Sequence, residues 1–233
     1  MKFPVLIPGI LRQRKNRFTA AVQLEGGETA MSYVPTTGRL TGALRPGCRV
    51  WLEKAHEPGR KTAYTLLLTE LKQGGLCSVN AALANALFAE AVVRGGLAAF
   101  PCEQIEKEVS HGHSRLDFRF ASHGAARWVE VKSVTFVEDG VGRFPDAPTA
   151  RGRRHLEELG TLAEGGDQAS VVFIAQRGDA QSFSPYEAVD PAFAETLRRV
   201  HQQGVAIHAY RCDVTLERIE IAEEIPVHVE END

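Results

Sequence analysis

The sequence predicts a two-domain α+β protein, in which a small closed β-barrel of the OB type precedes an α/β domain with a mixed central sheet. Three observations predict this division. Short apolar runs separated by turn residues fill residues 1–72, helical patterns begin after Gln73-Gly74-Gly75, and the net charge changes sign near the same place. We therefore assign residues 1–74 to the barrel and residues 75–233 to the second domain.

The first domain is predicted to contain five short strands. Turn sequences such as Glu25-Gly26-Gly27 and Arg45-Pro46-Gly47 separate them. Five strands in about 70 residues suit a small closed barrel, which leaves no sheet edge exposed, and such barrels often bind single strands or oligosaccharides. The predicted strands are Val5–Leu11, Arg17–Leu24, Glu28–Tyr33, Arg49–Lys54 and Thr62–Thr69.

The second domain follows the order α-β-β-β-α-β-α-β, which predicts a mixed sheet with helices on its faces. Each predicted helix ends at a glycine, as helices commonly do. The predicted helices are Asn80–Arg94, Arg151–Glu164 and Pro191–Gln203, and a loop is expected from Glu138 to Pro148. The predicted strands are Ile105–Val109, Ser114–Phe120, Trp128–Thr135, Ser170–Ala175 and Val205–Tyr210.

Composition indicates an ordinary soluble protein, with 43% hydrophobic and 24% charged residues in a chain of 233. No apolar run reaches the ~18 residues of a membrane helix, and the N-terminus does not resemble a signal peptide. The scattered cysteines, Cys48, Cys77, Cys102 and Cys212, are expected as buried free thiols. These features predict a cytoplasmic protein with no membrane partner.

Charge is divided unevenly along the chain. Residues 1–72 carry 12 Lys/Arg against 5 Asp/Glu, a net charge of about +7, whereas residues 73–233 carry about −10. Eight of the acids lie in residues 213–233, which we expect to form an acidic tail that does not contact nucleic acid. The basic first domain has the sign needed to bind a polyanion.

Two acids and a lysine stand out in the predicted sheet. Asp117 lies in one alternating segment, and Glu130-Val131-Lys132 lies in the next. Side chains alternate across a strand, so Glu130 and Lys132 share a face. A turn near His123-Gly124 would pair the two strands as a hairpin and place Asp117 beside them.

These three residues are the smallest set of side chains needed for metal-assisted phosphodiester cleavage. Asp117 and Glu130 would bind Mg²⁺ or Mn²⁺, hard cations that prefer oxygen ligands. Lys132 would orient a water molecule or stabilise developing charge. Taken alone, a Glu-x-Lys pattern on a strand more often marks a solvated face, because surface ion pairs contribute little.

The order of elements around this trio resembles the PD-(D/E)xK nuclease superfamily, and the whole chain resembles the sugar fermentation stimulation protein A (SfsA) family. The resemblance implies an OB-like first domain, a restriction-endonuclease-like second domain, and DNA binding. It also implies a link to the regulation of sugar (maltose-type) catabolism. The matching segments include Arg14-Lys15-Asn16-Arg17-Phe18, Ala84-Asn85, Ser114-Arg115-Leu116-Asp117, Glu130-Val131-Lys132-Ser133-Val134-Thr135 and Phe144-Pro145-Asp146-Ala147. Thr36 stands where the family usually has Asn.

Each of the other candidate residues has both a functional and a structural interpretation. Glu90, on the first predicted helix, can join the metal site or remain a solvated helix residue, and the two readings are equally weighted. Arg151 and His155 share a helix face and can bind phosphate near the helix N-terminus, or belong to a solvated basic turn. A basic run in the barrel can contact the backbone of DNA or RNA, or form a solvated face; it comprises Arg12, Arg14, Lys15 and Arg17.

Two functions follow from these patterns. The first is a Mg²⁺-dependent nuclease that cleaves DNA or RNA. The second is a non-catalytic DNA-binding protein without sequence specificity that acts in regulation. The two are compatible, because the barrel can hold a strand that the second domain cuts. Carbohydrate binding by the barrel is a weaker third hypothesis.

Overall fold

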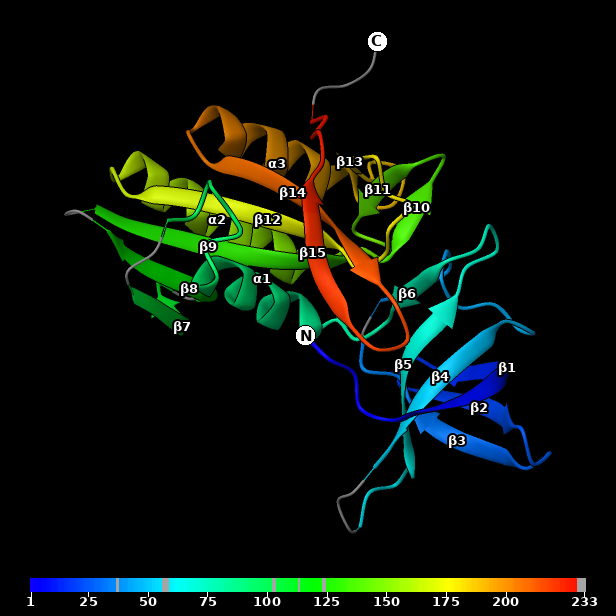
Figure 1. Cartoon of the computed structure of the whole chain (residues 1–233). Helices are drawn as coiled ribbons and strands as arrows, with labels where there is room; N and C mark the ends of the chain where they lie inside the picture. Colours follow the sequence, from blue (N-terminus) through cyan, green and yellow to red (C-terminus); the bar gives the residue numbers. More distant parts are fainter. Residues whose placement is uncertain (37, 56–58, 102–103, 113, 123–124, 230–233) are drawn as a thin grey trace.

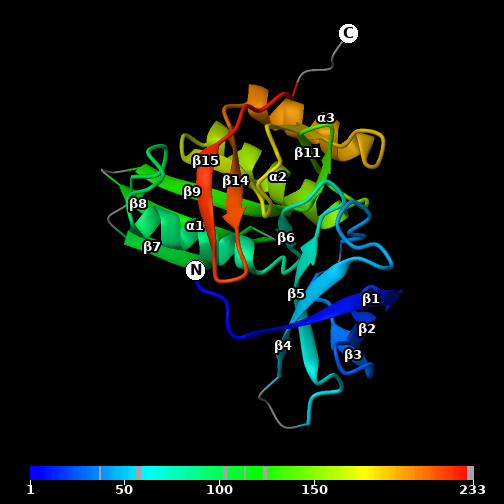
Figure 2. The same ribbon diagram turned by 45° about the vertical axis from the view of Figure 1, so that its right-hand side comes forward.

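The structure is a computed structural model that describes residues 1–36, 38–55, 59–101, 104–112, 114–122 and 125–229. It contains an N-terminal five-stranded OB-like barrel followed by a mixed-sheet α/β domain with three helices, as predicted. Figures 1 and 2 show the barrel at one end of the second domain, next to β6 (Leu76–Ser78). Within the described residues, none of the helices is long and apolar enough to cross a membrane.

The barrel closes because its third and fifth strands pair. Antiparallel pairs join β1 to β2, β2 to β3, β1 to β4 and β4 to β5, and the parallel pairing of Ser32 with Tyr64 completes the ring. Leu11, Val22 and Leu66 fill its interior. The strands are β1 (Leu6–Asn16), β2 (Thr19–Leu24), β3 (Thr29–Tyr33), β4 (Arg49–Lys54) and β5 (Tyr64–Glu70).

The second domain is built on a six-stranded sheet in the order β15-β14-β12-β9-β8-β7. Its strands are β7 (Gln104–His111), β8 (Ser114–Ser122), β9 (Ala125–Val134), β12 (Gln168–Ala175), β14 (Ala206–Val214) and β15 (Ile219–Glu224). The strands β8 and β9 pair antiparallel, as the predicted hairpin requires, whereas β12 runs parallel to β9. The predicted turn at His123-Gly124 and Cys102 lie outside the described residues.

Helices cover both faces of this sheet (Figure 1). On one face α1 (Leu83–Val93) packs its buried side chains against Val129 and Val131 of β9. On the other face α2 (Ala150–Glu164) and α3 (Pro191–Gln202) pack together over a second apolar cluster. Because side chains alternate along β9, Glu130 and Lys132 point toward the face that carries α2.

Several short strands escape sequence prediction. The expected loop from Glu138 to Pro148 contains β11 (Val141–Phe144), which pairs with β10 (Phe136–Glu138) and β13 (Ser182–Pro185) in a small separate sheet. The strand β6 (Leu76–Ser78) extends the barrel sheet. Elements of three or four residues are too short for periodicity to reveal them.

The acidic segment expected as a tail is partly structured. Ile219–Glu224 forms β15, which pairs antiparallel with β14 at the edge of the central sheet. Its glutamates are paired with neighbouring bases, as in the contact of Glu223 Oε1 with Arg211 Nε at 2.7 Å. Charged side chains are common on edge strands because they discourage further strand pairing. Several of the acids in residues 213–233 therefore belong to an edge strand rather than to a solvated tail.

The cysteine prediction holds where the structure tests it. Cys48, Cys77 and Cys212 are free and buried. Burial raises the pKa of the Cys77 thiol to about 12, so this thiol stays protonated and unreactive at neutral pH. These cysteines act as small apolar residues in the core.

A segment between β11 and α2 joins the two domains. Asp146 Oδ2 accepts a hydrogen bond from the backbone N–H of Leu40 in the barrel, at 2.9 Å. A Cβ added at Gly38 would lie 2.8 Å from the same carboxylate oxygen, so the close approach requires glycine there. Ala81 N, just before α1, donates to Pro35 O at 3.1 Å. These contacts fix the barrel against the second domain.

Truncation of Phe88 tests the core between α1 and the sheet. Phe88 has no exposed surface, and its ring lies 5.0 Å from that of Phe100 and 5.3 Å from that of Phe118. We expect Phe88→Ala to lower the free energy of unfolding by about 3–5 kcal/mol, measured by urea denaturation. Val93→Ala is the control, because Val93 is 73% exposed and should change stability by less than about 0.5 kcal/mol. Equal effects at both positions would contradict this packing.

Candidate active site

The predicted trio meets where β8 and β9 separate. The last paired residues of this ladder are Phe118 and Val129, so Asp117 and Glu130 lie one position beyond it. There the Asp117 side chain replaces the strand partner, because Asp117 Oδ2 accepts the N–H of Val131 at 2.8 Å. Glu108 lies opposite Asp117 on β7 with φ of 54°, an unusual value for a residue with a side chain. The strand pairing is therefore interrupted on both sides of Asp117.

Asp117 is a half-buried carboxylate with a shifted pKa. Its Oδ1 accepts a hydrogen bond from Asn85 Nδ2 of α1 at 2.7 Å. Burial, reinforced by the negative charge of Glu130, raises the pKa of Asp117 to about 6. The backbone N–H of Val131, the Lys132 ammonium and Asn85 oppose this rise incompletely. Repulsion between two close carboxylates is what a bound cation relieves.

Glu130 is 3% exposed and has two basic neighbours. Lys132 Nζ donates to Glu130 Oε1 at 2.5 Å, which confirms that the two residues share a face of β9. The Nδ1 atom of His155 contacts the same oxygen. Burial alone would raise the pKa of Glu130, but Lys132 and His155 outweigh it and hold that pKa below its usual value. Glu130 Oε2 is buried and has no hydrogen-bond partner within the described residues.

His155 occupies a different position from the one expected. Its ring is 3% exposed and lies against Glu130, so it is not available to a phosphate on the surface. Arg151, which is exposed, donates from Nε to His155 Nε2 at 3.3 Å. With Nε2 accepting, Nδ1 carries the hydrogen and donates to Glu130. His155 therefore orients the buried acid, and Arg151 alone of the pair faces solvent.

The two carboxylates can accommodate a divalent cation. Mg²⁺ binds through one or two protein carboxylates and keeps several waters, so Asp117 and Glu130 are a sufficient protein contribution. Glu130 Oε2, which has no hydrogen-bond partner among the described residues, would be available as an oxygen ligand. Among the described residues, no group of three or more His, Cys, Asp or Glu side chains is arranged around a metal position. A Mg²⁺ ion at this position would therefore take most of its ligands from water.

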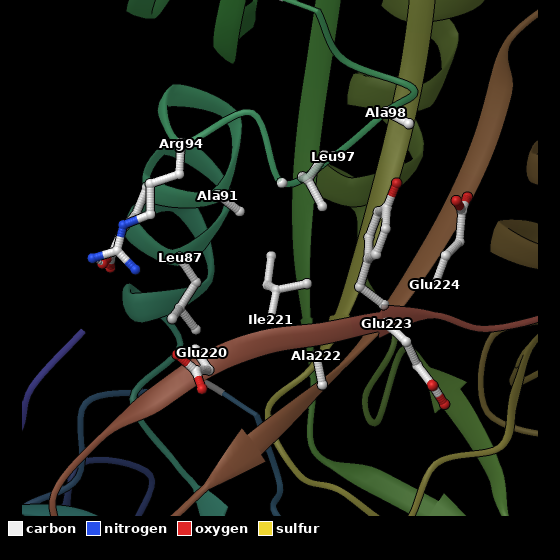
Figure 3. A pocket seen from close by; sticks show the side chains of 13 residues that line it. Leu87, Ala91, Arg94, Leu97, Ala98, Glu220, Ile221, Ala222, Glu223 and Glu224 are labelled. Atoms are coloured by element: carbon white, nitrogen blue, oxygen red, sulfur yellow. Dashed lines mark ion pairs between the residues drawn. The ribbon is translucent and has the colours of Figure 1, made fainter.

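Glu90 does not reach this site. It forms ion pairs with Arg94 and with the N-terminal ammonium group, the latter at 3.1 Å. It lines a separate pocket between α1 and β15, whose walls include Leu97 and Ile221 (Figure 3). Of the two interpretations of Glu90, the structure supports the one in which it is a helix residue held in ion pairs. Asn85, rather than Glu90, is the α1 residue that contacts the trio.

A cleft of about 310 Å³ runs between the barrel and the second domain at Lys132. The barrel contributes Arg17, Thr36 and Gly38 to its lining. The second domain contributes Ala81, Val131, Lys132, Ser133, Thr135 and the segment from Arg143 to Thr149. Thr149 caps α2, because its hydroxyl accepts the N–H of Gly152 at 3.0 Å. The N-terminus of α2, which favours anions, therefore opens toward the cleft.

The basic run of the barrel divides into different environments. Arg14 is half-buried and donates to the carbonyl oxygens of Arg17 and Gly38, both at 2.8 Å. Arg12 and Lys15 are exposed and bond to Gln23 and Gln13 respectively. Arg17 is exposed and lines the cleft. Arg14 thus supports the structure of the turn, while Arg17 faces the candidate site.

Sequence reasoning did not assign Asn85 and His155 their contacts in this site. Asn85 lies within the segments that carried the family resemblance, which is the available signal for it. Its hydrogen bond crosses from a helix to a strand 32 residues away, so spacing could not predict it. The contact between His155 and Glu130 spans 25 residues for the same reason.

Two family models match successive parts of the chain. The family model described as SfsA N-terminal OB domain matches residues 13–79, and the model described as Sugar fermentation stimulation protein RE domain matches residues 82–218. A sugar fermentation stimulation protein homolog of Moorella thermoacetica is 46% identical over 213 residues, covering 90% of each chain. The corresponding homolog of Desulforamulus reducens is 38% identical over 227 residues, covering 97% of this chain and 94% of that protein.

A solved structure agrees over almost the full length. It is that of Pyrococcus furiosus SfsA in complex with Ca²⁺, with a TM-score of 0.89 and 31% sequence identity. The match covers 98% of each chain. The fold of barrel and α/β domain described above is therefore shared with a protein that has been solved with Ca²⁺.

Proposed function

Because this chain belongs to the sugar fermentation stimulation protein family, SfsA, we propose that it binds nucleic acid and cleaves phosphodiester bonds of DNA or RNA with Mg²⁺ or Mn²⁺. The convergence of Asp117, Glu130 and Lys132 beside a cleft between the domains carries this proposal. Such a trio supplies oxygen ligands and a positive charge to one place. The Ca²⁺ in the Pyrococcus furiosus complex supports an oxygen-ligated divalent cation in this family.

Each residue of the trio has a distinct role. Asp117 and Glu130 would hold the cation, and the chemistry it would supply is polarisation of a phosphate oxygen and a lower pKa for a bound water. Lys132 donates hydrogen bonds from Nζ and stabilises negative charge on the reacting phosphate, or orients the water. Its side chain is 12% exposed, so this charge acts in a partly desolvated setting where it has more effect.

A cleavage assay with the full chain tests the proposal. The purified protein is incubated with single- and double-stranded DNA and RNA in Mg²⁺, in Mn²⁺ and in EDTA. We expect cleavage of at least one substrate with either metal ion and none in EDTA. Absence of cleavage across this panel in a folded protein would overturn the catalytic reading.

A second function is favoured by the charge of the barrel. Residues 1–72 carry about +7, and Lys15 and Arg17 are exposed. These features suit a non-catalytic DNA-binding protein that acts in the regulation of sugar catabolism, with binding dominated by phosphate contacts. Binding should then weaken steeply with salt, and Lys15→Ala should reduce the slope of log K against log salt by about 1. Salt-independent binding would contradict this second function.

Substitution of His155 tests the support of Glu130. His155→Ala removes the hydrogen bond that orients Glu130 but leaves both proposed metal ligands in place. We expect Mg²⁺ affinity to fall roughly 10- to 100-fold, as for other residues that orient a metal ligand. Isothermal titration with Mg²⁺ measures this, and His155→Gln, which retains a donor, should recover part of the loss. His201→Ala is the control, because His201 bonds to the Val205 carbonyl away from the site.

A further inference from the structure

The turn between β1 and β2 presents a cation and an aromatic ring side by side. Arg17 lines the cleft, and within the described residues no carboxylate forms an ion pair with it. Phe18, the next residue, is 47% exposed, an unusual exposure for a phenylalanine. Tyr33, which pairs with Thr19 just after this turn, is 37% exposed. The Tyr33 ring already has the guanidinium of Arg60 over it, so the exposed ring that follows the free positive charge of Arg17 is that of Phe18.

Hydrogen bonds hold this turn in place. Arg14 donates to the carbonyl oxygens of Arg17 and Gly38, which ties the turn to the barrel loop that also lines the cleft. Phe18 O accepts the N–H of Val34, and Phe18 N donates to Asn16 Oδ1 at 2.8 Å. Both the N–H and the carbonyl oxygen of Phe18 form hydrogen bonds, so the backbone that carries the exposed ring is held in position. A pre-organised ring loses little freedom when a ligand stacks on it.

The facing wall of the cleft is also positive. Arg143 and Lys132 line it together with the N-terminus of α2. Among the described lining residues the single acid is Asp146, and its Oδ2 already accepts the N–H of Leu40. Arg143 has an exposed partner, Glu138, at 3.5 Å, a surface pair that an incoming phosphate can displace. Positive groups therefore outnumber acids in the lining, which favours an anionic ligand.

The limited access to Lys132 favours single-stranded over double-stranded nucleic acid. Lys132 is 12% exposed and Glu130 is 3% exposed, so a scissile phosphate must enter the cleft rather than lie on the surface. Its volume of about 310 Å³ is near the lower limit of small-molecule pockets. A duplex keeps its bases paired inside a wide cylinder, whereas an unpaired strand can enter and offer its bases for stacking.

We propose that the chain selects single-stranded nucleic acid, with the backbone running between Arg17 and Arg143 toward Lys132 and an unpaired base stacked on Phe18. The inference rests on the proposed nucleic-acid-binding function and names the substrate class of that site. Loops of OB-type barrels between the first two strands commonly contact oligonucleotides, which agrees with the position of this turn. Base stacking on an aromatic ring tolerates any base, so the site selects strandedness rather than sequence.

The test measures binding by fluorescence anisotropy in EDTA, where cleavage does not interfere. The probes are a labelled 15-nucleotide DNA strand, the same strand as RNA, and the DNA strand annealed to its complement. We expect at least one single strand to bind roughly tenfold or more tighter than the duplex. Phe18→Leu, which keeps an apolar side chain of similar size but no ring, should weaken single-strand binding roughly 5- to 150-fold. Phe18→Trp should retain it, and duplex binding should change little in both variants.

Charge variants separate the cleft from the rest of the barrel. Arg17→Ala should weaken single-strand binding and lower the salt slope by about 1, whereas Lys54→Ala, an exposed barrel lysine that does not line the cleft, should do so less. Equal affinity for duplex and single strand, or equal binding by Phe18→Leu and wild type, would overturn the inference. Single-strand binding by a protein that never cleaves would leave it standing and remove only the nuclease proposal.

Discussion

Replacing Asp117 with Asn is expected to lower metal-dependent cleavage by roughly 10³-fold, because losing a metal-ligand charge removes several kcal/mol of transition-state stabilisation. The fold should persist. An Asn side chain can accept the Val131 N–H through its oxygen and donate to a reoriented Asn85. Gel-based cleavage rates and Mg²⁺ titration measure the two effects. Asp117→Asn with wild-type cleavage and metal affinity would remove Asp117 from the site.

The same variant has a predicted pH-dependent stability. Folding raises the pKa of Asp117 from 3.8 to about 6, so the folded protein binds more protons than the unfolded chain between these values. Without divalent cations, the charged Asp117 therefore costs stability fully above pH 6 and not at all below about pH 4. Asp117→Asn should be more stable than wild type at pH 8 by on the order of 2 kcal/mol, and the difference should vanish near pH 4. Urea denaturation in EDTA at both pH values measures this, and Asp213→Asn, at an exposed acid on β14, is the control.

The second large effect is expected for Lys132→Ala. Loss of this ammonium should reduce the cleavage rate by roughly 10²- to 10³-fold, the usual result of removing one preorganised donor to a developing charge. Mg²⁺ binding should be retained, since Asp117 and Glu130 remain, and this distinguishes the variant from Asp117→Asn. Glu130 keeps its contact with His155, so its buried carboxylate is not left without a partner.

Two measurements make the Lys132 result specific. Circular dichroism and a urea transition check that the variant folds, because breaking a buried ion pair can itself destabilise a protein by about 3–5 kcal/mol. Lys107→Ala is the matched control, at an exposed lysine of β7 in the same sheet. Cleavage by Lys132→Ala at the rate of Lys107→Ala would leave Lys132 as a structural partner of Glu130 and remove its catalytic role.

Elements with strong local patterns were predictable from sequence. The barrel strands Glu28–Tyr33 and Arg49–Lys54 and the helix Arg151–Glu164 were found within one residue of their predicted bounds. Their patterning and flanking turn residues suffice because one face of each packs on a core. By contrast, β11 and β13 depend on pairing between segments about 40 residues apart, which leaves no local signal. The strand β15 was hidden by its glutamates, which suggested a solvated tail.

The candidate site shows the same division. Alternation along β9 predicted that Glu130 and Lys132 share a face, and the 2.5 Å contact confirms it. The pattern could not show that His155 approaches Glu130 from α2 rather than facing a phosphate. Nor could it show that Glu90 turns away toward the N-terminus. Helix orientation relative to a sheet is set by packing of the whole core, and one residue of rotation decides which side chain reaches the site.

The sequence by itself determined the order of the longer elements, the family, the trio on adjacent strands and the basic character of the first domain. These features depend on side-chain chemistry and short-range spacing. Tertiary structure decided that the trio lies beside a cleft shared with the barrel, that Arg17 rather than Arg14 faces it, and that Asn85 and His155 support the acids. Each of these depends on contacts between residues distant in the chain. The cleft forms when the two domains pack together through Asp146 and Gly38, whereas the contacts of Asn85 and His155 form when α1 and α2 pack on the sheet of the second domain.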